Sequence, residues 1–185
     1  MAKILFLFLL LSIAVCNQTT SGQNSATNKS EAVSGWQTLN QPTYSIQYPE
    51  PWKLDQSGEM GTSFCLFAPL KSDTDNFRTN INLILQDLSG QNIDLNKFME
   101  ISFVQLKKML TNYTLAESKK EKNNNGEYYK IVYSGDQGIF HLKFEQYCWT
   151  INDKTFVLTF TSKQDQFSGY LETGEKVMNS FQLKK

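Results

Sequence analysis

The sequence predicts an α+β domain in which two helices pack on a mainly antiparallel sheet. Short segments with apolar residues at every second position alternate with turn residues over most of residues 36–163. Two other segments, near 94–110 and 167–181, repeat apolar residues every three or four positions, as amphipathic helices do. A chain of 185 residues that is 40% hydrophobic and 13% aromatic can bury one core. One folded domain is therefore expected over residues 35–185.

The domain is expected to begin with two short strands, WQTL and YSIQY. In the second strand, Tyr44, Ile46 and Tyr48 project from one face at the period of two. Pro49 then ends the ladder, because proline offers no backbone N–H. Trp52 follows this turn and is expected to fold over the open end of the core.

The next elements are two strands and a helix. The segments SFCLFAPL and INLILQDL have the composition and length of strands. Asp94 then has the side chain and position of a helix N-cap. The apolar side of the predicted helix ends at about Leu110, and its lysines are left outside.

Four closely spaced strands and a second helix complete the predicted domain. Asn125-Gly126 and Asn152-Asp153 are turn signals that predict hairpins, so these strands are expected to form an antiparallel meander. The final helix is expected within residues 167–181 and places Gly174 on its apolar side. Because glycine weakens a helix interior, this position suggests a close approach to the sheet.

The first 16 residues read as an export signal. Met1-Ala2-Lys3 is a short basic start, an apolar run of 12 residues follows, and Cys16 comes next. A membrane-spanning helix needs about 20 apolar residues, so this run is too short to be one. The segment SIAVC resembles a bacterial lipobox, in which the cysteine is lipidated, although Val15 stands where that motif has a small residue. Two alternatives remain: lipidation of Cys16, which we favour, or simple cleavage that releases a soluble periplasmic or secreted protein.

Residues 17–34 are predicted to be a flexible polar tether. They are rich in Asn, Thr, Ser and Gln, contain no aromatic residue and show no period. A membrane-anchored domain needs such a spacer, although a disordered N-terminus would look the same.

The charge composition excludes several partner classes. Basic and acidic residues number 18 each, so no positive excess favours nucleic acid. Arg78 is the only arginine, which leaves one candidate for bidentate recognition of phosphate. No phosphate-binding loop, metal-ligand motif or catalytic elbow is visible. We therefore expect no nucleic acid, no cofactor, no metal and no enzymatic activity.

The element order and the motif YSIQYP with Trp52 resemble the superfamily of PsbP, Mog1 and DcrB over residues 36–185. The resemblance implies an α/β/α sandwich around a twisted, mainly antiparallel sheet. Among these proteins the bacterial envelope lipoproteins are the nearest analogue. Their common theme implies a non-catalytic domain that binds or supports other proteins, here a protein of the bacterial cell envelope that faces the periplasm.

Three aromatic or titratable residues of one predicted strand are candidates for contact with a protein partner. His141, the only histidine, shares a face with Tyr147 and Trp149 at the period of two. If this face is exposed, the three side chains form a contact patch. The alternative is that a helix covers the face and makes Tyr147 and Trp149 part of the core.

Cys65 and Cys148 are expected either to stay free and buried in their aromatic strands or to form a disulfide after export. The leading functional hypothesis is a lipid-anchored envelope protein that binds a protein partner. The alternative is a periplasmic carrier of a small molecule or lipid, with the aromatic residues lining a pocket between helix and sheet.

Overall fold

The computed structural model describes residues 35–184. The predicted export signal, Cys16 and the predicted tether of residues 17–34 lie outside the described residues and stay predictions.

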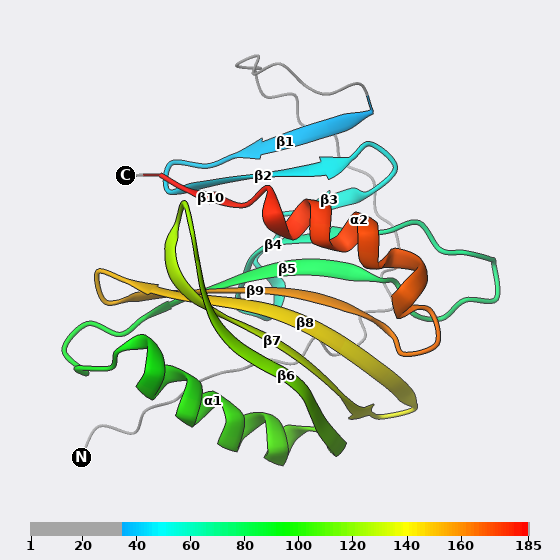
Figure 1. The fold of residues 1–185 in the computed structure, drawn as a ribbon. Helices are drawn as coiled ribbons and strands as arrows, with labels where there is room; N and C mark the ends of the chain where they lie inside the picture. The colour runs from blue at the N-terminus through cyan, green and yellow to red at the C-terminus, as the bar shows by residue number, and fades with distance from the viewer. Residues whose placement is uncertain (1–34, 185) are drawn as a thin grey trace.

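The centre of the domain is a seven-stranded sheet in which every pairing is antiparallel (Figure 1). The strand order is β3-β4-β5-β9-β8-β7-β6, so the predicted meander of the last four strands is confirmed. Asn152 and Asp153 have φ values of 50° and 58° in the turn between β8 and β9, which suits a tight hairpin. The strand bounds are β3 (Lys53–Asp55), β4 (Thr62–Phe67), β5 (Asn80–Asp87), β6 (Thr111–Asn123), β7 (Gly126–Gln137), β8 (Phe140–Ile151) and β9 (Lys154–Lys163).

A second, smaller sheet has the order β1-β2-β10 and joins both ends of the described chain. Its strands are β1 (Trp36–Asn40), β2 (Tyr44–Pro49) and β10 (Gln182–Leu183). The apolar face predicted for β2 is confirmed, since Tyr44, Ile46 and Tyr48 are all buried. The sequence reading missed β10, the short strand β3 and the 3-10 turn η1 (Glu59–Gly61), which are all too short to show a period.

The two helices lie on opposite sides of the large sheet, which confirms the sandwich (Figure 1). Helix α1 (Leu95–Met109) contacts β6, β7 and β8, and Asp94 caps it by accepting a hydrogen bond from the backbone N–H of Lys97 at 2.7 Å. Helix α2 (Phe167–Asn179) contacts β9 and the small sheet. Within residues 35–184, no helix is long and apolar enough to cross a membrane.

Alternate residues of β8 enter two separate apolar cores. Tyr147 and Trp149 belong to the core under α2 and the small sheet, whereas Phe144 and Cys148 belong to the core under α1. This division follows from the strand geometry, in which successive side chains point to opposite faces.

Helix α2 lies very close to the sheet at Gly174, as the sequence suggested. A Cβ atom at this position would come within 2.9 to 3.1 Å of three ring atoms of Phe160. Phe160 is itself fully buried and packs against Phe167 with ring centroids 4.8 Å apart. The glycine therefore lets the helix backbone rest on an aromatic ring.

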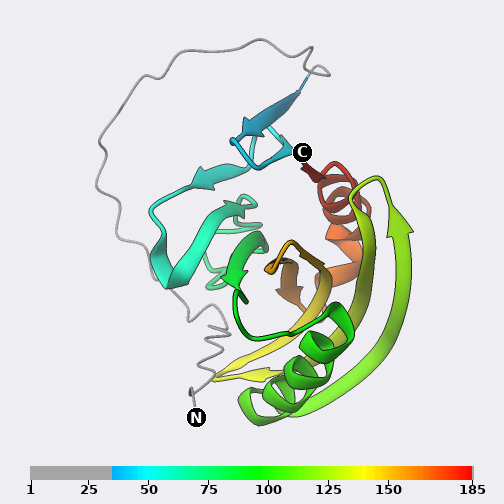
Figure 2. The same ribbon diagram turned by 90° about the vertical axis from the view of Figure 1, so that its left-hand side faces the viewer.

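Two groups of polar contacts tie the large sheet to α2 and to the small sheet. The β6–β7 hairpin bends along the domain until its tip lies beside the end of α2 and β10 (Figure 2). There the Asn125 amide donates to the backbone oxygen of Phe181 at 2.9 Å and accepts from the backbone N–H of Leu183 at 2.8 Å. Beneath α2, the Lys130 ammonium lies 3.2 Å from a carboxylate oxygen of Glu145 and 3.1 Å from one of Glu175.

Candidate functional site

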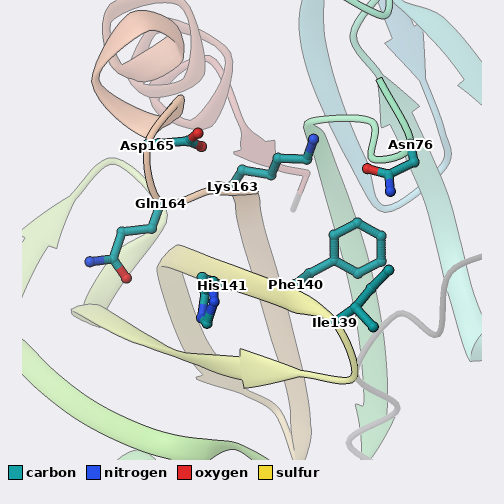
Figure 3. Close-up of a pocket in the computed structure, with 7 residues that line it drawn as sticks. All are labelled: Asn76, Ile139, Phe140, His141, Lys163, Gln164 and Asp165. Carbon is teal, nitrogen blue, oxygen red and sulfur yellow. The ribbon is translucent and has the colours of Figure 1, made fainter. Parts of the chain in front are cut away.

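An open hollow of about 600 Å³ lies at one end of the large sheet, where three turns meet (Figure 3). The turns are the β7–β8 hairpin, the β9–α2 connection and the loop between β4 and β5. Loops held by a rigid sheet are common positions for binding residues. The lining residues are Asn76, Ile139, Phe140, His141, Lys163, Gln164 and Asp165.

The β7–β8 hairpin brings an exposed apolar residue to the hollow. Gly138 takes φ of +58°, and Ile139 follows it with 79% of its surface exposed. Phe140 is buried next to it, and its ring lies 5.3 Å from that of Phe77. Ile139 is the most exposed large hydrophobic residue within residues 35–184. The hollow therefore offers an apolar side chain that its own fold does not use.

A partly buried ion pair joins the loop before β5 to the end of β9. The Lys163 ammonium donates to Asp75 at 2.5 Å, and Gln166 donates to the other carboxylate oxygen at 3.3 Å. Burial acts to raise the pKa of Asp75, but the hydrogen bonds from Lys163, Gln166 and the Phe77 N–H outweigh it, so the pKa is lowered. Asp75 is thus ionised at neutral pH and fixes one wall of the hollow.

His141 extends from the start of β8 beside this wall (Figure 3). Its Nδ1 atom lies 2.6 Å from Asp136, which also accepts a hydrogen bond from Asn112 at 2.6 Å. The hydrogen bonds from Asn112 and from His141 lower the pKa of Asp136, so this carboxylate accepts from both side chains. The imidazole side chain is 79% exposed, and its Nε2 atom faces away from Asp136.

The lining consists of two apolar and five polar residues. The seven lining residues include no Ser, Thr or Cys that the His141–Asp136 pair could activate as a nucleophile. Within residues 35–184, no group of three or more His, Cys, Asp or Glu side chains is placed to hold a metal ion.

Comparison with solved structures finds the same architecture in other proteins. CyanoP, the cyanobacterial PsbP of Synechocystis, matches with a TM-score of 0.61 and 14% identity, over 86% of this chain and 98% of its own. LpqN, which is involved in cell envelope biogenesis of Mycobacterium tuberculosis, matches with a TM-score of 0.63 and 15% identity, over 81% of this chain and 92% of its own.

A Pseudomonas aeruginosa protein of unknown function, PA94, matches with a TM-score of 0.56 and 9% identity, over 78% of this chain and 94% of its own. The chain has a PsbP-like fold. No family model and no curated protein matches the sequence. The likeness of the PsbP-like domain to its neighbours is therefore one of fold.

The predicted contact patch is wrong for two of its three residues. In the PsbP-like domain, Tyr147 is 2% exposed and Trp149 is fully buried. They share a face with His141, as expected, but α2 and the small sheet cover the part of that face where they lie. His141 stands at the uncovered end and lines the hollow. The alternative that Tyr147 and Trp149 belong to the core is confirmed.

The disulfide alternative is also wrong, because Cys65 and Cys148 are both free and buried in the PsbP-like domain. Their strands, β4 and β8, are separated by β5 and β9. Three steps of about 4.8 Å place the strands about 14 Å apart, whereas a disulfide needs Cα atoms within about 7 Å. Burial raises the pKa of both thiols, as expected of inert core cysteines.

Sequence reasoning found His141 but missed the other residues of the hollow. Ile139 carried a signal, since a large apolar residue directly after Gly138 in a hairpin turn has no core to enter. Lys163 and Asp165 carried none, because only the folded chain brings the β9–α2 connection beside β8. There the backbone N–H of Gln164 donates to the backbone oxygen of His141 at 2.9 Å.

Proposed function

We propose that this chain is a non-catalytic protein of the bacterial cell envelope, lipid-anchored through Cys16, whose PsbP-like domain binds a protein partner at the hollow. The observation that carries the proposal is the exposure of Ile139, 79%, beside a hollow of about 600 Å³. Large apolar side chains on a well-supported edge are the usual anchors of protein contacts.

The envelope location is supported from two directions. The start of the sequence has the basic residue, the short apolar run and the cysteine of an exported lipoprotein. LpqN, which has the same fold, is itself involved in cell envelope biogenesis. A tethered domain with a partner-binding edge agrees with both.

A carrier role has less support because the space between α2 and the sheet is filled. The rings of Tyr128 and Trp149 stack with centroids 5.2 Å apart, and Phe181 lies 5.4 Å from Trp149. These aromatic residues therefore pack on one another, and the hollow lies elsewhere, at the end of the sheet.

The proposal is tested by photo-crosslinking in living cells. A photoreactive amino acid replaces Ile139, and a matched control carries it at Asn124, an exposed residue at the opposite end of β7. The twelve residues of β7 separate the two positions by about 35 Å along the strand. We expect a discrete crosslinked product from position 139 and none from position 124.

The anchor is tested in the same cells with Cys16→Ala. Radiolabelled fatty acid should appear on the wild-type chain and not on the variant, and the product at position 139 should weaken when the domain is no longer held at the membrane. Equal products at both positions, or no product at 139, would refute the binding role. Unlabelled wild-type protein would refute the anchor.

A further inference from the structure

The polar groups of the hollow divide into those that the fold has already paired and those left for a partner. Lys163, the lysine of the lining, is held by Asp75. Lys143, two residues beyond His141 on β8, lies over the Phe167 ring at 4.8 Å from its centroid. The positive charges nearest the hollow are therefore engaged within the domain.

Among the unpaired lining groups, Asp165 is the one that carries a full negative charge. Asp165 is exposed and has no hydrogen-bond or ion-pair partner among residues 35–184. The His141 ring contacts Asp136 through Nδ1 and leaves Nε2 without a hydrogen-bond partner among residues 35–184. The side-chain amides of Asn76 and Gln164 also form no hydrogen bond within the described part of the chain and can accept through their oxygens.

The apolar residues and Asp165 line opposite sides of the same hollow. Figure 3 shows Phe140 and Ile139 on one side of the hollow, with Asp165 and Gln164 across from them and His141 between. A ligand that covers Ile139 and extends across the hollow therefore faces the Asp165 carboxylate.

From this arrangement we propose that the hollow recognises a segment of a partner protein in which an apolar side chain stands next to a lysine or arginine. The apolar side chain packs on Ile139 and Phe140, and the cation pairs with the Asp165 carboxylate. Lysine and arginine carry the charge that complements this carboxylate, whereas an acidic segment would face it with a like charge. This inference rests on the proposed function and adds the chemistry of the partner.

The test is a selection of displayed random heptapeptides on the purified full chain. We expect enriched peptides to contain an apolar residue beside lysine or arginine. Binding of the enriched peptides, measured by fluorescence polarisation, should weaken at least about tenfold with Ile139→Asp and with Asp165→Lys. Val104→Asp is the matched control, because Val104 is also an exposed apolar residue, 54% exposed on α1 and outside the hollow. It should leave the affinity unchanged.

Fold integrity is separable from binding because Ile139 makes little contact with the domain. The thermal midpoint of Ile139→Asp should match that of Val104→Asp, as expected for surface substitutions. Enrichment of acidic or uncharged peptides, no enrichment at all, or binding that Ile139→Asp leaves intact would overturn the inference. If acidic or uncharged peptides were enriched but position 139 still gave a crosslinked product in cells, the lysine or arginine of the partner would be refuted and the proposed function would stand.

Discussion

Replacing Gly174 by alanine sets two effects of similar size against each other, and the structure decides which is larger. Alanine is favoured over glycine in a helix interior by about 1 kcal/mol. Its methyl group, however, would lie 2.9 to 3.1 Å from three ring atoms of Phe160, where about 3.5 to 4.0 Å is comfortable. Phe160 is fully buried, so its ring cannot turn away into solvent.

Overpacking in a filled core costs about 1 to 3 kcal/mol. We therefore expect Gly174→Ala to lower the free energy of unfolding by about 1 kcal/mol or slightly more, measured by urea denaturation. Gly169 is the matched control in the first turn of α2, because a Cβ atom there would meet only the Lys71 ammonium, at 3.6 Å. Gly169→Ala should raise the free energy of unfolding by up to about 1 kcal/mol.

A double-mutant cycle isolates the contact. Phe160→Leu removes the ring atoms that the new methyl group meets, so Gly174→Ala should cost less in that background, with a coupling energy of about 1 kcal/mol or more. If Gly174→Ala stabilised the wild-type protein as much as Gly169→Ala does, the close approach of α2 to the sheet would be refuted.

Three further substitutions test polar contacts by urea denaturation. Lys130→Met leaves the carboxylate of Glu145, which is 3% exposed, without its counter-charge and should lower the free energy of unfolding by about 3 kcal/mol. Adding Glu145→Gln should restore part of this loss. If the losses of the two single variants simply added in the double variant, the ion pair would be refuted. Asp75→Asn should cost about 2 kcal/mol at pH 7. Because folding lowers the pKa of Asp75, this contribution to stability is present above about pH 4 and is lost as the pH falls through the folded-state pKa. The free energies of unfolding of variant and wild type should therefore converge at low pH. A difference that stays constant with pH would disprove the ionic contribution. Asn125→Asp removes the side-chain N–H that donates to the backbone oxygen of Phe181 and should lower the free energy of unfolding by about 2 kcal/mol. The substitution Asn124→Asp at the exposed neighbour should cost less. Equal losses would show that the Asn125 hydrogen bond does not stabilise the domain.

Local patterns predicted the elements whose cause is local. Asp94 caps α1 through its own side chain, and the alternation of Tyr44, Ile46 and Tyr48 needs only a strand with one buried face. Gly174 indicated a close contact because a glycine within an apolar stripe weakens its helix unless the backbone packs closely there. These features follow from sequence neighbours and period.

The predictions that were wrong concern which other elements pack beside or above a given strand. Trp149 alternates with its neighbours whether or not a helix covers it, so its burial depends on where α2 packs. The distance between Cys65 and Cys148 depends on strand order, which places β5 and β9 between them. The hollow combines three turns that are far apart in the chain, and no window of residues contains them all. Tertiary neighbours decide each of these cases.

The pairing of β2 with β10 has a consequence for how the domain reaches its final state. Leu183 pairs with Tyr44, so the second edge of β2, near the start of the described residues, is paired only by residues near their end. Until β10 is in place, β2 is therefore paired on one edge with β1 and lacks a partner on the other. The small sheet is therefore completed only after α2 and β10 have formed.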